Sequence, residues 1–401
     1  MKKVLILTTS TGQGHNQAAS SVENSFKKSG YQTIKYDFLA KNSKFLNNLV
    51  VYGYEFLASK LPALYGFLYN LSDTKLTNML LKIPFYLNSR KFFKKANEIQ
   101  PDLIIASHAF SINILQKYKK LHPEVPYILI VTDFKAHSTY ISKVVDAYIT
   151  GSNYTKNSLI EKGIDSDKIF PIGIPISEKF YTEVTRAEEL KDNYFNLLLM
   201  SGSLGLDAIS IVLKKLLENK NKLRITVVCG KNEHLKTNLL NYCKNNTSSN
   251  KKLHILGFTN DISYLMDYSD MIISKPGGLT VTESIVKNIP LIIPFAIPGQ
   301  EKENIDFLLS EGYSILLRSI DNLNTTVDYY INNKIELTKL KRKLQTLADT
   351  YSIDEIVTIG ENLINKWKNN SPAIIFSNWW VIFISYHFFE IYVWILHYFL
   401  F

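Results

Sequence analysis

Residues 4–19 read VLILTTSTGQGHNQAA, and the order of their elements indicates the fold class. It begins with a short apolar run that is typical of a buried strand. A loop containing Gly12 and Gly14 follows, and the next apolar residues recur at the spacing of one helix face, at Ala18, Ala19, Val22 and Phe26. A strand, a glycine loop and a helix in direct succession indicate the first unit of a parallel α/β sheet.

The same plan returns in the second half of the chain, where residues 197–209 read LLLMSGSLGLDAI. Further short apolar runs, separated by helical patterns, are found at residues 103–106, 127–132, 146–150, 223–230, 252–258, 270–274 and 290–295. Strands that alternate with helices predict a parallel sheet with helices on both faces. We therefore predict an α/β protein of two doubly wound, Rossmann-like domains facing a cleft, since 401 residues suffice for two cores.

The pattern divides the chain into four segments. We place an N-terminal domain at residues 1–175, a polar linker at 176–196, a C-terminal domain at 197–370 and an apolar tail at 371–401. Twelve of the 31 tail residues are aromatic, and tryptophan and tyrosine favour the membrane interface. We expect the tail to lie on a membrane or to anchor the protein there. The alternatives are that it covers an apolar groove of the protein or has no selected role.

The net charge of +10 is concentrated in one region. Residues 41–95 contain nine lysines and arginines against only Glu55 and Asp73, and aromatic residues are interleaved with them. Apolar residues recur at helical spacing between Phe45 and Leu57, which predicts an amphipathic helix. Such a surface suits an anionic membrane, whereas no nucleic-acid-binding motif is present. The alternative is that this face packs on the domain's own core.

The two cysteines, Cys229 and Cys243, lack the spacing of a metal or redox motif. They predict a reducing compartment and no disulfide framework. The apolar run after the N-terminal lysines is too short for an export signal, so we interpret it as the first strand.

Three loops combine glycine with a predicted helix start, at Gly12–Gly14, Gly202–Gly205 and Gly277–Gly278. Unpaired amides and the positive end of a helix dipole make such loops suitable for binding phosphate. Neither the GxGxxG nor the P-loop motif is present, which argues against dinucleotide binding and NTP hydrolysis. The third loop also has an ordinary local explanation, because Thr280 and Glu283 fit a helix capping box.

Two blocks carry a family resemblance. Residues 274–284, SKPGGLTVTES, and 289–304, IPLIIPFAIPGQEKEN, resemble the nucleotide-sugar signature of inverting two-domain glycosyltransferases that act on lipids. The segments TSTGQGHNQAA at 9–19, VTDFKAH at 131–137 and GIPI at 173–176 narrow the resemblance. They are similar to those of the monogalactosyldiacylglycerol synthases and processive diacylglycerol glucosyltransferases. The lipid-linked peptidoglycan N-acetylglucosaminyltransferase is related less closely.

The resemblance covers about residues 1–365 and implies a GT-B fold. It implies an N-terminal domain that receives diacylglycerol and a C-terminal domain that binds a UDP-sugar. The residues that it assigns to the nucleotide sugar are Gly14, Ser201, Gly202, Ser203, Phe258, Gly277, Gly278, Leu279, Thr280, Glu283, Gln300, Glu301 and Asn304. Among these, Phe258 would lie by the uracil and Glu283 would bind the ribose diol. Gln300 and Glu301 would hold sugar hydroxyls, with support from Asn304.

The transfer reaction needs a base for the acceptor hydroxyl and stabilisation of the leaving diphosphate. His15 is our candidate base, because the positive end of the following helix disfavours the imidazolium form. Alternatively, His15 orients its loop or contacts phosphate. Asp133 would orient a base, and His137 would contact the acceptor. The relatives usually carry tryptophan and histidine shortly after His137, where this chain has Tyr140 and Ser142, which leaves the acceptor geometry and the number of sugars added open.

We expect neither a metal nor a cofactor, since the UDP-sugar is the substrate and we find no clustered carboxylate–histidine motif in the chain. The resemblance implies that helix dipoles and loop amides stabilise the leaving group instead. The MSGSLG segment does not fit a hydrolase elbow, because residue 201 is serine where GxSxG requires glycine.

These observations predict a UDP-sugar:1,2-diacylglycerol β-glycosyltransferase, with glucose favoured, at the cytoplasmic face of the cell membrane. The residues do not separate glucose from galactose, and they indicate neither processivity nor an oligomeric state. Three alternatives stay open: transfer to another lipid-linked acceptor, epimerisation of the UDP-sugar, and non-catalytic sensing of it.

Overall fold

The computed structural model describes residues 1–9, 13–42, 48, 52–53, 56–58, 60–73, 89–182, 192–200 and 208–369. Several predictions lie outside these residues. They are the second glycine loop with Ser201, Gly202 and Ser203, most of the amphipathic helix expected between Phe45 and Leu57, and the tail at 371–401.

The N-terminal domain is a six-stranded parallel sheet in the order β2-β1-β3-β4-β5-β6. Its strands are β1 (Lys3–Thr8), β2 (Gln32–Asp37), β3 (Leu103–Ala106), β4 (Tyr127–Ile130), β5 (Ala147–Ile149) and β6 (Ile169–Phe170). Its helices are α1 (Gln13–Lys28), α2 (Phe38–Asn42), α4 (Pro62–Ser72), α6 (Arg90–Ile99), α7 (Ser111–Leu121) and α8 (Asn153–Glu161). The central strands β3 and β4 are buried throughout, because helices cover both faces of the sheet.

The C-terminal domain repeats the plan with the strand order β12-β11-β10-β7-β8-β9, again all parallel. Its strands are β7 (Phe195–Met200), β8 (Leu223–Val228), β9 (Lys251–Leu256), β10 (Met271–Ser274), β11 (Leu291–Ile293) and β12 (Ser314–Leu316). Its helices are α9 (Ala208–Leu217), α10 (Glu233–Asn246), α11 (Ile262–Asp267), α12 (Gly278–Val286), α13 (Gln300–Ser310), α14 (Asn322–Asn332) and α15 (Lys334–Ala348). The predicted pair of doubly wound sheets is confirmed.

Three strands were not predicted: β2, β6 and β12. Each lies at an edge of its sheet. The edge strand β2 has the sequence QTIKYD, in which polar residues interrupt the apolar ones, and most of its side chains stay partly exposed. The interrupted pattern of β2 therefore lacks the continuous apolar signal by which the central strands were recognised.

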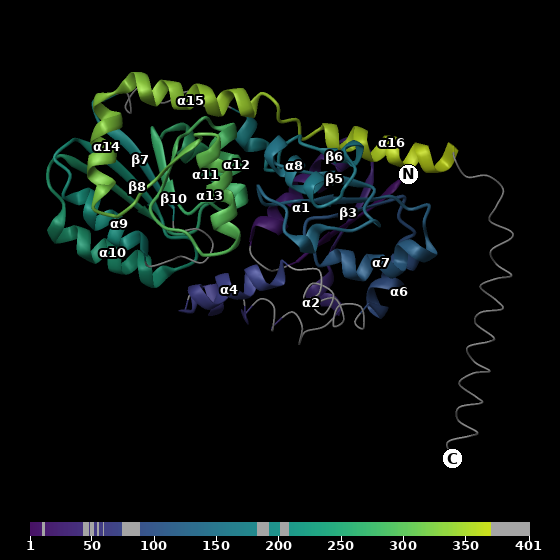
Figure 1. Ribbon diagram of the computed structural model, residues 1–401. Coiled ribbons are helices and arrows are strands. Elements are labelled where there is room, and N and C mark those ends of the chain that lie inside the picture. Colours follow the sequence, from purple (N-terminus) through teal and green to yellow (C-terminus); the bar gives the residue numbers. More distant parts are fainter. Residues whose placement is uncertain are drawn as a thin grey trace, which may run out of the picture.

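The last described helix, α16 (Glu355–Asn369), packs on the N-terminal domain although its sequence lies within the predicted segment 197–370. Its buried Ile356 and Ile359 join a core cluster with Phe26 and Leu103. Figure 1 shows α15 over the C-terminal domain and α16 over the N-terminal domain. The chain thus returns to its first domain at the end of the fold.

The two domains are in close contact where α12 begins. A Cβ atom added to Gly278 would lie 1.9 Å from the carbonyl oxygen of Thr132, so only glycine permits this approach. Asn304 joins the domains beside it, because its Oδ1 accepts from the Phe134 amide at 2.9 Å and its Nδ2 donates to the Pro276 carbonyl at 3.0 Å. These contacts bring the carboxyl-end loops of the two sheets together.

Candidate active site between the two domains

A cavity of about 1180 Å³ lies between the domains. Every predicted site residue within the described part of the chain lines it: Gly14, His15, Asp133, His137, Phe258, Gly277, Gly278, Leu279, Thr280, Glu283, Gln300, Glu301 and Asn304. Ligands of parallel α/β sheets bind at the carboxyl ends of the strands, and the cavity is at that edge of both sheets. The fold therefore brings the residues that were predicted from sequence motifs together in one cavity.

His15 lies in the first turn of α1, directly after β1. Its Nδ1 is 2.7 Å from the carbonyl oxygen of Ser107 and 3.3 Å from Oγ1 of Thr132. Burial lowers the pKa of His15 to about 4, and the Ser107 hydrogen bond opposes this only in part. The imidazole is therefore neutral near pH 7, as expected, but burial rather than the helix dipole is the main cause. Because the carbonyl can only accept, Nδ1 carries the proton and Nε2 is free to accept one.

Glu283 is buried on α12 and lines the cavity. Burial alone raises the pKa of its carboxyl to about 8. Within the part of the chain that the structure describes, no group donates a hydrogen bond to it. The capping-box explanation is wrong, because α12 begins at Gly278, before Thr280, and its N-cap Gly277 has no side chain to supply. A buried carboxyl without such a structural role is suited to accept hydrogen bonds from a ligand.

The two glycines at the start of α12 have different surroundings. A Cβ at Gly277 would meet no protein atom within 4 Å, whereas one at Gly278 would clash with Thr132. Gly277 thus borders open cavity, and Gly278 borders the other domain. The backbone of this loop is exposed to a ligand on one side and braced by the N-terminal domain on the other.

Asp133 and Gln300 meet across the cleft. Nε2 of Gln300 donates to Oδ1 of Asp133 at 2.6 Å. Burial raises the pKa of Asp133 to about 7, although the Gln300 hydrogen bond acts in the opposite direction. Glu301 is paired with Lys275 and accepts from the Ile297 amide at 2.8 Å. Both residues predicted to hold sugar hydroxyls are therefore already hydrogen-bonded to protein groups in this structure.

His137 holds the end of α4 in place. Its Nδ1 accepts from the Thr139 amide at 3.2 Å, which leaves Nε2 to donate to the Tyr69 carbonyl at 3.3 Å. Burial also lowers the pKa of His137. Because both ring nitrogens are occupied, this geometry disfavours His137 as a base. Its predicted contact with the acceptor stays a prediction.

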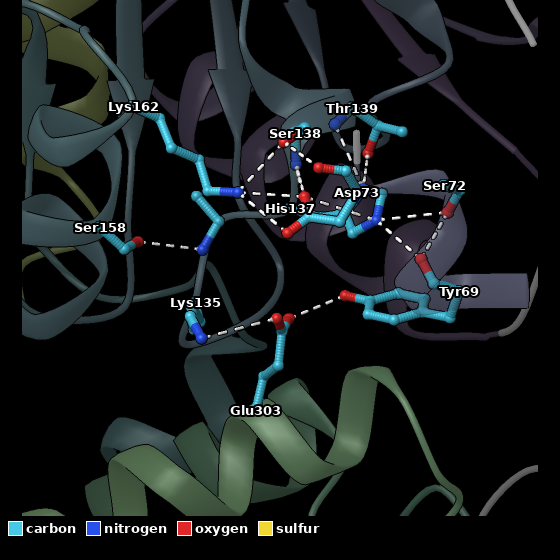
Figure 2. A network of polar contacts seen from close by, with 11 residues as sticks. Tyr69, Ser72, Asp73, Lys135, His137, Ser138, Thr139, Ser158, Lys162 and Glu303 are labelled. Atoms are coloured by element: carbon cyan, nitrogen blue, oxygen red, sulfur yellow. Dashed lines mark hydrogen bonds and ion pairs between the residues drawn. The ribbon is translucent and has the colours of Figure 1, made fainter. Parts of the chain in front are cut away.

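Helix α4 is tied to both domains through a polar network (Figure 2). At its end, Asp73 accepts from the Ser138 amide at 2.6 Å and pairs with Lys162 at 3.0 Å. On its side, the Tyr69 hydroxyl donates to Glu303 of α13 at 2.8 Å. This helix therefore spans from the N-terminal domain to α13 of the C-terminal domain.

Several cavity residues were not predicted as site residues. His108 follows β3, and Tyr65, Leu68 and Tyr69 come from α4. A histidine directly after a buried strand was a usable signal, because the carboxyl ends of parallel strands meet at one edge. The residues of α4 carried no such signal. Within the described residues, no group of three or more His, Cys, Asp or Glu could hold a metal ion, and the expectation of a metal-free reaction stays a prediction.

Two facing Rossmann-like sheets with an interdomain cavity define the GT-B class, and solved structures agree. MurG of Acinetobacter baumannii matches with a TM-score of 0.58 at 15% identity, covering 90% of this chain and 100% of that one. Anabaena HepE in complex with UDP matches with a TM-score of 0.55 at 14% identity, covering 92% and 100%. These similarities concern the fold.

Family models and a curated relative place the chain more closely. Residues 15–176 match monogalactosyldiacylglycerol (MGDG) synthase, and residues 196–352 match the glycosyltransferase family 28 C-terminal domain. The processive diacylglycerol beta-glucosyltransferase of Bacillus subtilis is 29% identical over 92% of this chain and 98% of its own length. The chain is a glycosyltransferase composed of these two domains, and the predicted resemblance is confirmed.

The contrast between Gly277 and Gly278 leads to a first prediction. Gly277→Ala should leave the thermal unfolding temperature nearly unchanged, because the added methyl group meets no protein atom. It should weaken UDP binding about tenfold or more, because the methyl group enters the cavity where backbone amides of the protein are expected to contact the diphosphate. Gly278→Ala should instead lower the unfolding temperature, since the Thr132 carbonyl must move away. Calorimetric UDP titration and thermal unfolding measure the two effects. Equal unfolding temperatures for both variants would contradict the interdomain role of Gly278.

A second prediction concerns protons. With a pKa of about 8, Glu283 is mostly protonated at pH 7, and hydrogen bonds from a ribose diol favour its charged form. UDP binding at pH 7 should therefore release protons, and affinity should rise with pH up to about 8. Titration calorimetry in buffers of different ionisation enthalpy measures the release. Glu283→Gln should remove the protons that Glu283 contributes to this release. An unchanged proton release in this isosteric variant would refute the role of Glu283 in binding the ribose diol.

Proposed function

We propose that this enzyme transfers glucose from UDP-glucose to 1,2-diacylglycerol with inversion, producing a membrane glycolipid. One observation carries the proposal: a single cavity joins the glycine loop of α12 to a neutral histidine and to the apolar side of α4. The names of the similar proteins support the same substrates, since the curated relatives are diacylglycerol beta-glucosyltransferases.

On the donor side, the first turn of α12 presents backbone amides and the positive end of its dipole to the diphosphate. Glu283 accepts from the ribose diol, and Phe258, which is 55% exposed at the cavity, lies by the uracil. When the donor sugar binds, Gln300 exchanges its hydrogen bond to Asp133 for one to a sugar hydroxyl. We propose that these groups stabilise the leaving diphosphate without a metal ion.

On the acceptor side, His15 acts as the general base. Its Nε2 takes the proton of the acceptor hydroxyl while that oxygen forms a bond to the anomeric carbon. The bond from the anomeric carbon to the diphosphate oxygen breaks at the same time, and UDP leaves with the electron pair. Before the donor sugar binds, Asp133 holds the Gln300 side chain at the cleft, and Asn304 holds the two loops at the reacting centre in register.

We further propose that α4 lies on the cytoplasmic leaflet of the membrane. Five large apolar side chains on and next to this helix are exposed: Leu61, Leu64, Phe67, Leu68 and Leu71. Four of them follow helical spacing, and Leu68 and Leu71 also line the cavity. This stripe would give acyl chains a continuous apolar path from the bilayer to the acceptor site. No helix in the described ranges is both long and apolar enough to cross a membrane.

The main experiment incubates the purified protein with diacylglycerol micelles and either UDP-glucose or UDP-galactose, with a chelator present. We expect a β-glucosyl lipid, identified by mass and by the anomeric NMR coupling, and little product from UDP-galactose. His15→Ala should lower kcat by about 100-fold or more while UDP affinity stays within about twofold. Undiminished turnover in His15→Ala would remove this histidine as the base, and absence of any glycolipid from the wild-type protein would overturn the proposed function.

The membrane proposal predicts a selective loss of binding. Leu64→Gln together with Phe67→Gln should weaken sedimentation with anionic liposomes at least about tenfold, because each buried apolar side chain contributes about 1.5–3 kcal/mol. The matched control is Ile335→Gln on α15, which is 73% exposed and lies in the other domain. Equal liposome binding by the double variant and the control would contradict a membrane-facing α4.

A further inference from the structure

The cavity holds a second histidine whose ring lies against that of His15. His108 follows β3, and the two ring centroids are 4.4 Å apart at an interplanar angle of 59°. They meet because β1 and β3 are neighbouring parallel strands, so the loops at their carboxyl ends are adjacent. Both rings line the cavity.

The hydrogen bonds define opposite tautomers for the two rings. His15 donates from Nδ1 to the Ser107 carbonyl at 2.7 Å, so its Nε2 is an acceptor. Nδ1 of His108 accepts from the Phe110 amide at 3.1 Å, so its proton is on Nε2. Burial keeps both rings neutral, and it lowers the pKa of His108 well below its usual value, with a further contribution from His15. One ring therefore offers a lone pair and its neighbour offers an N–H group.

This pairing fits a ligand with two neighbouring oxygens. A hydroxyl that gives its proton to His15 needs no donor on the same side, and a donor to that oxygen would reduce its nucleophilicity. The Nε2–H of His108 is better matched to a second oxygen, in the substituent of the adjacent carbon. In 1,2-diacylglycerol the group beside the free hydroxyl is an ester, whose carbonyl oxygen is a hydrogen-bond acceptor.

We propose that His108 binds the acceptor lipid, donating from Nε2 to the ester carbonyl oxygen next to the hydroxyl that His15 deprotonates. This inference rests on the proposed function and extends it to the recognition of the lipid. His108 takes no proton in the reaction. It fixes the glycerol backbone so that the reacting hydroxyl faces His15, and it favours ester-linked over ether-linked lipids.

The test compares two acceptors, 1,2-diacylglycerol and the 1,2-dialkylglycerol that keeps the hydroxyl but lacks ester carbonyls. His108→Leu should lower kcat/KM about three- to tenfold with the ester lipid, the range expected for one neutral hydrogen bond. With the ether lipid, the same variant should stay within about twofold of wild type. His108→Gln, which keeps an N–H donor at similar reach, should recover most of the loss with the ester lipid.

Calorimetric UDP binding and thermal unfolding provide the controls, and both should match wild type in the variants. If His108→Leu fails to fold, His108→Asn, whose donor lies nearer the backbone, takes its place with the same expected contrast between lipids. An equal loss with both lipids, or no loss with either, would overturn the role of His108 and leave the proposed function standing. A wild-type protein that binds UDP but glucosylates neither lipid would overturn the proposed function itself, and the role of His108 with it.

Discussion

The contact between Gly278 and the Thr132 carbonyl is the constraint on which the rest of the structure depends. Since even one methyl group would reach within 1.9 Å of that oxygen, the absence of a side chain sets how closely the two domains approach. Asn304 then bonds to backbone groups of both domains beside this point. As a result the start of α12 and the first turn of α1, which carries His15, share one cavity. If the two domains were farther apart, the glycine loop of α12 and His15 would lie on two separate surfaces.

Burial in that cavity shifts three of its titratable groups toward their uncharged forms. The pKa of His15 is lowered to about 4, while the pKa values of Asp133 and Glu283 are raised to about 7 and about 8. At pH 7 Glu283 is therefore mostly protonated and Asp133 about half protonated, which reduces their repulsion of an anionic nucleotide, and the histidine remains able to accept a proton. Hydrogen bonds from a ligand change these charges further, so binding and proton movement are coupled.

Helix α4 connects an exposed apolar surface with helix α13 beside the cavity. Its apolar stripe is exposed on one side, while Tyr69 on the same helix reaches Glu303 of α13, three residues after Gln300. Figure 2 shows Lys135 paired with Glu303, and the Asp73–Lys162 ion pair at the end of α4. The helix proposed to contact the lipid is thereby attached to α13, which begins at Gln300. The proposed acceptor and donor sites are therefore adjacent although they are built from distant parts of the chain.

The central strands and the glycine loops could be predicted from the sequence, because buried parallel strands are continuous apolar runs and glycine marks the turns that follow them. Polar residues interrupt the edge strand β2, and the edge strands β6 and β12 are only two and three residues long, so pairing in the folded sheet defines them. The motif residues of both domains were recognisable, but the chain alone did not indicate that His108 lies against His15, or that Glu283 is free of a capping role. Nor did it indicate that α16 returns to the first domain. Such facts depend on which loops and faces meet across long sequence separations, and only the packed tertiary structure decides that.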